Sequence, residues 1–412
     1  MSSYRILLLM PVTTYRAADF VSAAIRLGVE VVVGSDQRQT LEEAAPGGTL
    51  ALDFKDSSSA VRRIVEFARE HPLDGVVGVE DETTVTAAEA SLALGLPHNP
   101  GEAVRLTRHK LRARELLRKS GIPVPQFWKF STEEDPRIAA RHVGYPCVLK
   151  PLFLSASRGV IRANDGESFA LAFERVKRLL ADPEILKKGG EAAGWILVES
   201  YIQGDEVAVE GLLVGGELKV LAIFDKPDPL EGPFFEETIY VTPSRFSEER
   251  QRHIIEMTAR TAFAVGLREG PLHAELRLNE EGIWPLEVAA RSVGGLCSRA
   301  LRFGAGMSLE ELIIRHALGM DLESLERERR AAGVMMIPIP RGGILKRFGG
   351  MESARAIPGI EQVVQSIPTG QSVVPLPEGA RYLGFIFARA TDPAAAETAL
   401  REAYRRLEIV IR

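Results

Sequence analysis

The chain has 412 residues, 45% hydrophobic and 26% charged, the balance of a soluble globular protein with room for two or three domains. Its net charge is −5 and we find no dense run of lysine and arginine, which argues against nucleic acid as the main partner. The two cysteines, Cys147 and Cys297, lie in no metal-binding spacing, which argues against a disulfide framework and a cysteine-based zinc site.

The first part of the chain predicts a parallel sheet. The apolar run within residues 1–12 is too short to span a membrane and lacks a small-residue cleavage site, so we expect a buried first strand in a cytoplasmic protein. Apolar strands then alternate with amphipathic helices, as in RILLLMPV, AADFVSAAIRLG and VEVVVGSD. This alternation predicts an α/β domain over residues 1–105, with helices on both faces of the sheet. MPVTTYR follows the first strand in place of G-x-G-x-x-G, so dinucleotide binding is not favoured.

The rest of the chain changes character. A basic helix, TRHKLRARELLRKSG, ends at Gly121, and short strands joined by turns follow from about residue 140 to 300. We expect an α+β domain over residues 106–330. GVMMIPIPRGGIL, IEQVVQSI and YLGFIFARA read as strands and DPAAAETALREAYRRL as a helix, which predicts a small α+β domain over residues 331–412.

The segment PLHAELRLNEEGIWPLEVAAR predicts a hairpin that turns at NEEG. Glu275 and Glu287 each lie six residues from Glu281, so an antiparallel pairing places them nearly opposite each other. Two carboxylates at that distance repel unless a cation lies between them, and Mg²⁺ takes hard oxygen ligands of this kind. The alternative is a solvated hairpin face whose charges pair weakly. Pro285 requires an edge or unpaired position because proline cannot donate in a ladder.

Arg291 lies two steps further along the same face and has the geometry to clamp a phosphoryl or carboxylate oxygen. A second anion-binding pattern is CVLKPLFLSASRGV, in which a strand ends at Lys150 and a loop of small residues, Ser155 to Gly159, follows. Small residues let backbone N–H groups face an anion. The alternative is a mobile hairpin loop, and the pattern is not a Walker A motif.

A third pattern is ILVESYIQGDEVAVE. Glu199 ends a strand, Tyr201 and Ile202 follow, and Glu206 opens the next strand. The backbone of such a hinge can read an adenine edge, and a carboxylate can accept both ribose hydroxyls. In isolation this segment reads as an exposed acidic turn. Lys110, likewise, is in isolation one more cation on a basic helix.

Taken together, Lys110, VLKP with its Ser/Gly loop, VESYIQGDE, HAELR and EVAARSVGG resemble, in order and spacing, the ATP-grasp superfamily of carboxylate–amine ligases. The resemblance covers essentially the whole chain and implies ATP and Mg²⁺ (or Mn²⁺) as cofactors. It implies that Lys110 and Lys150 contact ATP phosphates, and that the loop with Ser155, Ser157 and Gly159 covers them as a lid. It also implies an adenine hinge at Glu199, Tyr201 and Ile202, a ribose ligand at Glu206, metal ligands at Glu275 and Glu287, and a phosphoryl contact at Arg291.

The chain departs from the family pattern at one clear position. Many members read E-x-N-x-R, with an asparagine oxygen on the second metal, and Ala289 stands in that place here. A water or a bidentate Glu287 then completes the shell, or the second metal is held less firmly. Arg158 lies inside a phosphate loop that has fewer glycines than in most members.

The resemblance implies that ATP activates a carboxylate as an acyl phosphate, which an amine attacks to form an amide. The segment FDKPDPLEGPFFEETIYVTPS resembles the stretch that runs past the substrate pocket in amino-acid ligases. Lys226 is therefore a candidate contact for phosphate or substrate carboxylate, Glu236 or Glu237 for an amine, and His273 for acid–base catalysis. Arg299 and Arg302 are candidate contacts for a carboxylate, and each of these residues has an ordinary structural alternative.

We expect small-molecule carboxylate and amine substrates, and a homodimer without membrane or nucleic-acid partners. Two alternatives stay open. One is an ATP-grasp enzyme that activates bicarbonate or formate. The other is a regulatory protein that binds ATP without catalysis, which Ala289 favours and the retained lysines, glutamates and arginine oppose.

Overall fold

The computed structural model describes residues 4–37 and 48–412; residues 1–3 and 38–47, which fall in the expected first domain, lie outside the described residues. The first unit is a parallel sheet in the order β3-β2-β1-β4. Alternate side chains of β1 pack into two separate cores, one with α1 and one with α2 and α3, so helices cover both faces as expected. The elements are β1 (Arg5–Leu9), α1 (Ala17–Arg26), β2 (Glu30–Ser35), β3 (Thr49–Ala51), α2 (Ser57–Glu70), β4 (Gly75–Gly78), α3 (Asp81–Ala93) and α4 (Gly101–Thr107).

The second unit is a small antiparallel sheet in the order β5-β8-β6-β7. The apolar face of α7, which includes Phe169, Phe173 and Val176, packs on this sheet. An Asp165 capping box starts that helix. The elements are α5 (Lys110–Lys119), β5 (Phe127–Ser131), α6 (Pro136–Ala139), β6 (Cys147–Pro151), β7 (Ile161–Ala163), α7 (Gly166–Leu180), α8 (Pro183–Gly189), the 3-10 turn Gly190–Gly194 and β8 (Trp195–Ser200).

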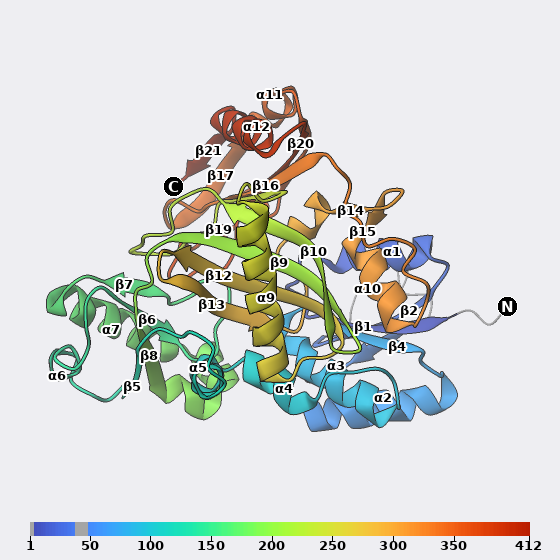
Figure 1. The fold of residues 1–412 in the computed structure, drawn as a ribbon, viewed down its shortest axis with the longest axis horizontal. Coiled ribbons are helices and arrows are strands. Elements are labelled where there is room, and N and C mark those ends of the chain that lie inside the picture. Colours follow the sequence, from blue (N-terminus) through green and yellow to red (C-terminus); the bar gives the residue numbers. More distant parts are fainter. Residues whose placement is uncertain (1–3, 38–47) are drawn as a thin grey trace.

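The third unit is an eight-stranded sheet in the order β13-β12-β9-β10-β11-β16-β20-β18. Helix α9 packs on the part of this sheet formed by β10, β9, β12 and β13 (Figure 1). The elements up to residue 317 are β9 (Asp205–Val214), β10 (Glu217–Lys226), β11 (Ile239–Thr242), α9 (Glu248–Val265), β12 (Gly270–Asn279), β13 (Gly282–Ala289), the 3-10 turn Cys297–Ala300, β14 (Arg302–Phe303), β15 (Met307–Ser308) and α10 (Leu309–Ala317).

The C-terminal segment continues this same sheet. The expected boundary at residue 331 coincides with the start of β16, but β16 pairs with β11, so Tyr240 lies opposite Val334. Strands β17, β19 and β21 form a separate small sheet. The elements are β16 (Ala331–Ile337), β17 (Gly343–Gly349), α11 (Met351–Arg355), β18 (Ile360–Gln365), β19 (Ser372–Val373), β20 (Gly384–Ala390), α12 (Pro393–Arg405) and β21 (Glu408–Ile411). The division into three domains stays a prediction.

Two further sequence expectations can be compared with the structure. Cys147 and Cys297 are both buried and free. No described helix combines the length and the apolar character that crossing a bilayer requires. Among the described residues, the largest core joins side chains of β1 and α1 to β16 and β20, which ties the first and last units of the chain together.

Candidate active site

One cavity of about 360 Å³ collects most of the residues that the sequence singled out. Its wall draws on the first sheet, the small antiparallel sheet, the eight-stranded sheet and the C-terminal segment. Two predicted residues, Gly159 and Lys226, do not line it. The predicted residues that do are Lys110, Lys150, Ser155, Ser157, Glu199, Tyr201, Ile202, Glu206, His273, Glu275, Glu287 and Arg291.

The expected hairpin is formed by β12 and β13, and Glu275 lies directly opposite Glu287. The register then shifts, because Leu276 pairs with Pro285 and Leu286 is left as a bulge. Strand β13 is the edge of the sheet, which gives Pro285 the position that a residue without an N–H requires. The two carboxylates therefore face the cavity side by side, as the sequence predicted.

Each of these two carboxylates has a lysine as its neighbour. Lys110 Nζ lies 3.3 Å from Glu287 Oε2 and donates to the carbonyl of Leu154 at 2.8 Å. Lys226 Nζ lies 3.2 Å from Glu275 Oε1. Because the side chains of Glu275 and Glu287 stay 23% and 30% exposed, their remaining oxygen lone pairs are open to a ligand.

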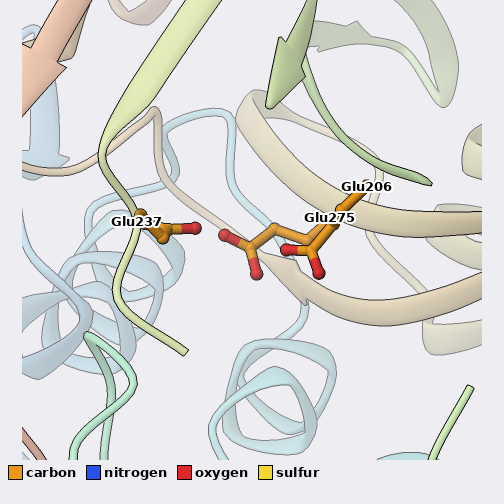
Figure 2. Close-up of side chains that lie close together, drawn as sticks. All are labelled: Glu206, Glu237 and Glu275. Atoms are coloured by element: carbon orange, nitrogen blue, oxygen red, sulfur yellow. The ribbon is translucent and has the colours of Figure 1, made fainter. Parts of the chain in front are cut away.

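Lys226 lies behind the cavity wall rather than in it. Its ammonium bonds to Glu206 at 2.7 Å and to Glu237, besides its contact with Glu275. Oxygens of the three carboxylates lie within 4.8 Å of one another, and the side chains point together from different segments (Figure 2). Burial lowers the pKa of Lys226, but the three carboxylates outweigh it and raise the pKa well above its ordinary value. One ammonium thus serves three carboxylates.

Of the two candidate amine contacts, only Glu237 lines the cavity. It accepts a hydrogen bond from the hydroxyl of Tyr240 at 2.7 Å. Burial and the nearby Glu275 raise the pKa of Glu237 to about 7, although Lys226 opposes the shift. Glu237 is therefore a carboxylate that gains from an additional positive partner.

His273 is held between two carboxylates. Its Nδ1 bonds to Glu210, and its Nε2 lies 3.4 Å from Glu275 Oε1. Burial lowers the pKa of His273, but Glu210 outweighs it and the pKa rises to about 9. Ala289 lies opposite His273 in the hairpin, and its methyl side chain offers no oxygen to a ligand. An acid–base role for His273 stays a prediction.

Glu199 lines the cavity as the centre of an ion network. Lys150 Nζ lies 2.5 Å from one of its oxygens, and Arg114 Nε lies 2.6 Å from the other. Burial raises the pKa of Glu199, but Arg114 and Lys150 outweigh it and lower the pKa to about 2. Glu199 therefore holds Lys150 in place at the cavity wall.

Sequence reasoning missed Arg114. Besides Glu199, it donates to the carbonyls of Pro285 and Leu286 at 3.1 and 2.7 Å, so it joins the hinge strand β8 to the edge strand β13. The available signal was helical spacing, because Arg114 and Leu117 lie three residues apart and are the two buried residues of α5.

The hinge after β8 is shaped by Arg277. Its guanidinium donates to the carbonyl of Ile202 at 2.6 Å and to Glu206 at 2.8 Å, and it lies 5.0 Å from the centre of the Tyr201 ring. Among the residues described, the Ile202 N–H donates no hydrogen bond, and this group is suited to read a base edge. Both oxygens of Glu206 already accept from cations, Lys226 and Arg277.

Arg291 is fixed by a residue of the first unit. Asp81, the first residue of α3, accepts from Arg291 at 2.8 Å, and the carbonyl of Ser292 accepts at 3.0 Å. Burial opposes the charge of Arg291, but Asp81 outweighs it and raises the pKa above its ordinary value. The buried Nε of Arg291 has no partner within the described residues. The sequence did not point to Asp81, which lies 210 residues away.

The loop after Lys150 is brought to the cavity at Ser155, Ala156 and Ser157. Gly159 instead packs against Pro151 and Leu179, and its N–H donates to the carbonyl of Pro377 at 2.8 Å. The structure therefore places Gly159 as a support for the loop rather than as a ligand contact. Arg299 and Arg302 lie in a separate cavity, paired with Asp19 and Glu361.

Three families match successive parts of the chain. The ATP-grasp N-terminal domain matches residues 21–98, the ATP-grasp domain residues 143–300, and the L-amino acid ligase C-terminal domain 2 residues 335–412. Together these matches span most of the sequence and leave residues 1–20, 99–142 and 301–334 outside them.

Individual proteins agree with these matches. Protein y4rH of Sinorhizobium fredii is 24% identical over 98% of this chain and 82% of its own. Alanine–anticapsin ligase of Bacillus subtilis is 28% identical over 63% of this chain, and the match spans 57% of that ligase. The solved structure of an L-amino acid ligase from Bacillus licheniformis covers 100% of both chains, with 26% identity and a TM-score of 0.85.

Proposed function

This chain belongs to the ATP-grasp superfamily and is an ATP-dependent carbon–nitrogen ligase, and on that premise we propose that it joins the carboxylate of one amino acid to the amine of another. The similarity to an L-amino acid ligase and to alanine–anticapsin ligase supports amino acids as the substrate class. The bond formed is then a peptide or closely related amide.

The observation that carries this proposal is the charge order along one cavity. Lys110, Lys150 and Arg291 supply cations on the wall near the hinge and hairpin, and Glu237 supplies a carboxylate on the wall near Tyr240. A nucleoside triphosphate needs the first group, and a substrate ammonium needs the second. The paired carboxylates Glu275 and Glu287 lie in the same wall.

Glu275 and Glu287 fit a divalent cation. They offer hard oxygens from facing strand positions, and both side chains are partly exposed to the cavity. We propose that they hold Mg²⁺ (or Mn²⁺), which when bound neutralises phosphate charge. Glu206 is less suited to this role, because both of its oxygens already accept hydrogen bonds from Lys226 and Arg277.

In the proposed reaction, a carboxylate oxygen of the first substrate attacks the terminal phosphorus of ATP, and ADP leaves. The amine of the second substrate then attacks the acyl carbon, and phosphate leaves as the amide forms. Lys110, Lys150 and Arg291 counter the charge on the transferred phosphoryl group. Because water would hydrolyse the acyl phosphate, the Ser155–Ser157 loop has to exclude it.

The lining near Glu237 supports an apolar side chain on the amino acid that is activated. Met336, whose N–H donates to the carbonyl of Thr238, lines the cavity together with Tyr382, Cys297 and Val293. These side chains offer dispersion contacts and little hydrogen bonding. We therefore propose an apolar L-amino acid whose ammonium binds Glu237.

The test is phosphate release from ATP and Mg²⁺ with single amino acids, pairs of amino acids, bicarbonate and formate. We expect release that requires two amino acids, one of them apolar, with one amide formed per phosphate. Release with bicarbonate or formate alone would overturn the proposal and favour an enzyme that activates one of these two one-carbon substrates. ATP binding without release for every substrate would favour a non-catalytic protein.

We also propose a cytoplasmic location and a homodimer. Equilibrium sedimentation of the purified chain checks the homodimer, because the particle should then have twice the mass of the 45.1 kDa chain.

A further inference from the structure

The C-terminal segment 374–380 contacts the loop that bears Ser155 and Ser157. The carbonyl of Pro377 accepts from the N–H of Gly159 at 2.8 Å, and the carbonyl of Glu378 accepts from Arg158 Nε at 2.7 Å. The two partners are 218 or more residues apart in the sequence, so they belong to different units of the fold. The backbone of one segment thus holds the backbone and one side chain of the other.

The loop has a conformation that needs such support. Ala156 and Ser157 have φ angles of 56° and 53°, in the left-handed region that residues with a Cβ rarely adopt. Gly159 has φ 74°, and a Cβ there would approach Pro151 and Leu179 to below 3 Å. Strained backbone of this kind persists only where the surroundings over-determine it.

Glu378 makes a second contact that fixes segment 374–380 itself. Its carboxylate bonds to Arg175 on α7 through two hydrogen bonds of 2.6 and 2.9 Å. The hydrogen bond from Arg175 lowers the pKa of Glu378, although burial opposes the shift. The turn is tight at Gly379, where a Cβ would meet the carbonyl of Val374. Glu378 therefore connects the C-terminal segment to both the loop and the helix behind it.

We propose that segment 374–380 is a latch that holds the Ser155–Gly159 loop over the nucleotide, and that Glu378 is its positioning residue. The inference rests on the proposed assignment of this loop to the ATP phosphates. The latch has a chemical consequence, because its last residue, Ala380, and the nearby Tyr382 line the same cavity as Ser155 and Ser157. Release of the latch admits water to the acyl phosphate and uncouples ATP use from amide formation.

The first test compares Glu378→Gln with the wild-type chain. The ion pair with Arg175 is half-exposed, with side chains 37% and 38% exposed, so we expect a rise in KM for ATP of about three- to fivefold. We also expect less amide per phosphate released, with kcat for phosphate release retained. The charge swap Arg175→Glu with Glu378→Arg should restore both values.

The matched control is Glu408→Gln. Glu408 pairs with Arg347 at 2.6 Å in the same C-terminal unit, with side chains 58% and 64% exposed, and neither residue lines the cavity. A change in KM for ATP and in coupling by Glu408→Gln equal to that of Glu378→Gln would overturn the latch. Unchanged values in Glu378→Gln, or a loss of kcat alone without a change in coupling, would also overturn it.

A second readout does not depend on ligase activity. Because Arg158 Nε donates to the carbonyl of Glu378, we expect trypsin to cleave after Arg158 mainly when the loop leaves the C-terminal segment. Fragments mapped by mass spectrometry therefore report on the latch. We expect faster cleavage after Arg158 in Glu378→Gln, and wild-type cleavage in the swap and in Glu408→Gln. If no substrate pair yields an amide, the proposed function fails, but that result alone does not refute the latch. In that case, equal cleavage after Arg158 in wild type and in Glu378→Gln would refute it.

Discussion

Two lysines in this site, the partly buried Lys150 and the buried Lys226, have opposite surroundings. Lys150 shares Glu199 with Arg114, so two cations face one carboxylate, and burial together with Arg114 lowers the pKa of Lys150 although Glu199 opposes the shift. Lys226 alone faces Glu206, Glu237 and Glu275, and its pKa is raised. The balance of neighbouring charge, rather than the residue type, makes one region suited to phosphate and the other to an ammonium group.

The largest effect we expect is the loss of turnover when the carboxylate of Glu287 is replaced. Glu287→Gln should lower turnover by about 10²–10³-fold while the fold stays intact, because a neutral amide no longer offsets a cation at the phosphates. Phosphate release and a thermal melt measure the two properties. Glu281→Gln, at the exposed turn of the same hairpin, is the control and should keep full activity. Normal turnover in Glu287→Gln would remove this residue from the metal site.

The second prediction sharpens the difference between the two lysines. Lys226→Met should lower the free energy of unfolding by about 3–5 kcal/mol, because it removes the cation shared by the buried Glu206 and two partly buried glutamates. Lys150→Met should cost much less, because Glu199 keeps Arg114 as a partner. Urea unfolding of both variants measures the contrast, and equal losses would contradict it.

The third prediction concerns ligand binding rather than stability. Lys150→Met should weaken ATP binding by about tenfold, the effect of losing one hydrogen bond to a charged group. Calorimetric titration with ATP measures the change. The control is Lys219→Met, at a partly exposed position on β10 where Lys219 pairs with the exposed Glu217. If the Lys150 variant binds ATP as tightly as wild type, Lys150 has no place at the phosphates.

The smallest effect is the pH dependence of Glu199. Its pKa of about 2 in the folded chain lies below the ordinary glutamate value of 4.5, so Glu199 contributes stability above pH 4.5 that is lost as the pH falls toward 2. Between about pH 5 and pH 4, the titration of Glu199 lowers the free energy of unfolding of the wild type by about 0.7 kcal/mol. Glu199→Gln has no carboxyl group at this position and loses nothing there. Urea unfolding of both at the two pH values should show their stabilities converging, and parallel changes would contradict the assignment.

Local patterns in the sequence predicted much of the fold. The N-terminal alternation of apolar strands and helices predicted the parallel sheet, and NEEG predicted the hairpin register of Glu275 and Glu287. The pairing of β11 with β16 could not be predicted, because the two strands are about 90 residues apart. An apolar pattern shows which face of a strand is buried but not which strand it pairs with. The expected C-terminal unit therefore turned out to extend the catalytic sheet.

The site, too, has residues that the sequence could predict and residues that it could not. Motif residues such as Lys110, Lys150 and Glu287 could be placed in one cavity from their order in the chain. The residues that orient them could not, because Asp81 and Arg114 carry no motif and act through contacts that only the fold creates. The ammonium of Lys226, expected at a substrate, is instead occupied by three carboxylates, a result of packing that sequence order does not encode.

The edge position of β13 has a consequence for the chain outside its chemistry. An uncovered edge strand offers unpaired carbonyls and N–H groups to strands of other molecules. Here the guanidinium of Arg114 occupies the carbonyls of Pro285 and Leu286, and Pro285 has no N–H to offer. The hairpin that carries Glu287 is thereby protected from adding a foreign strand, so solubility and the shape of the site depend on the same arginine.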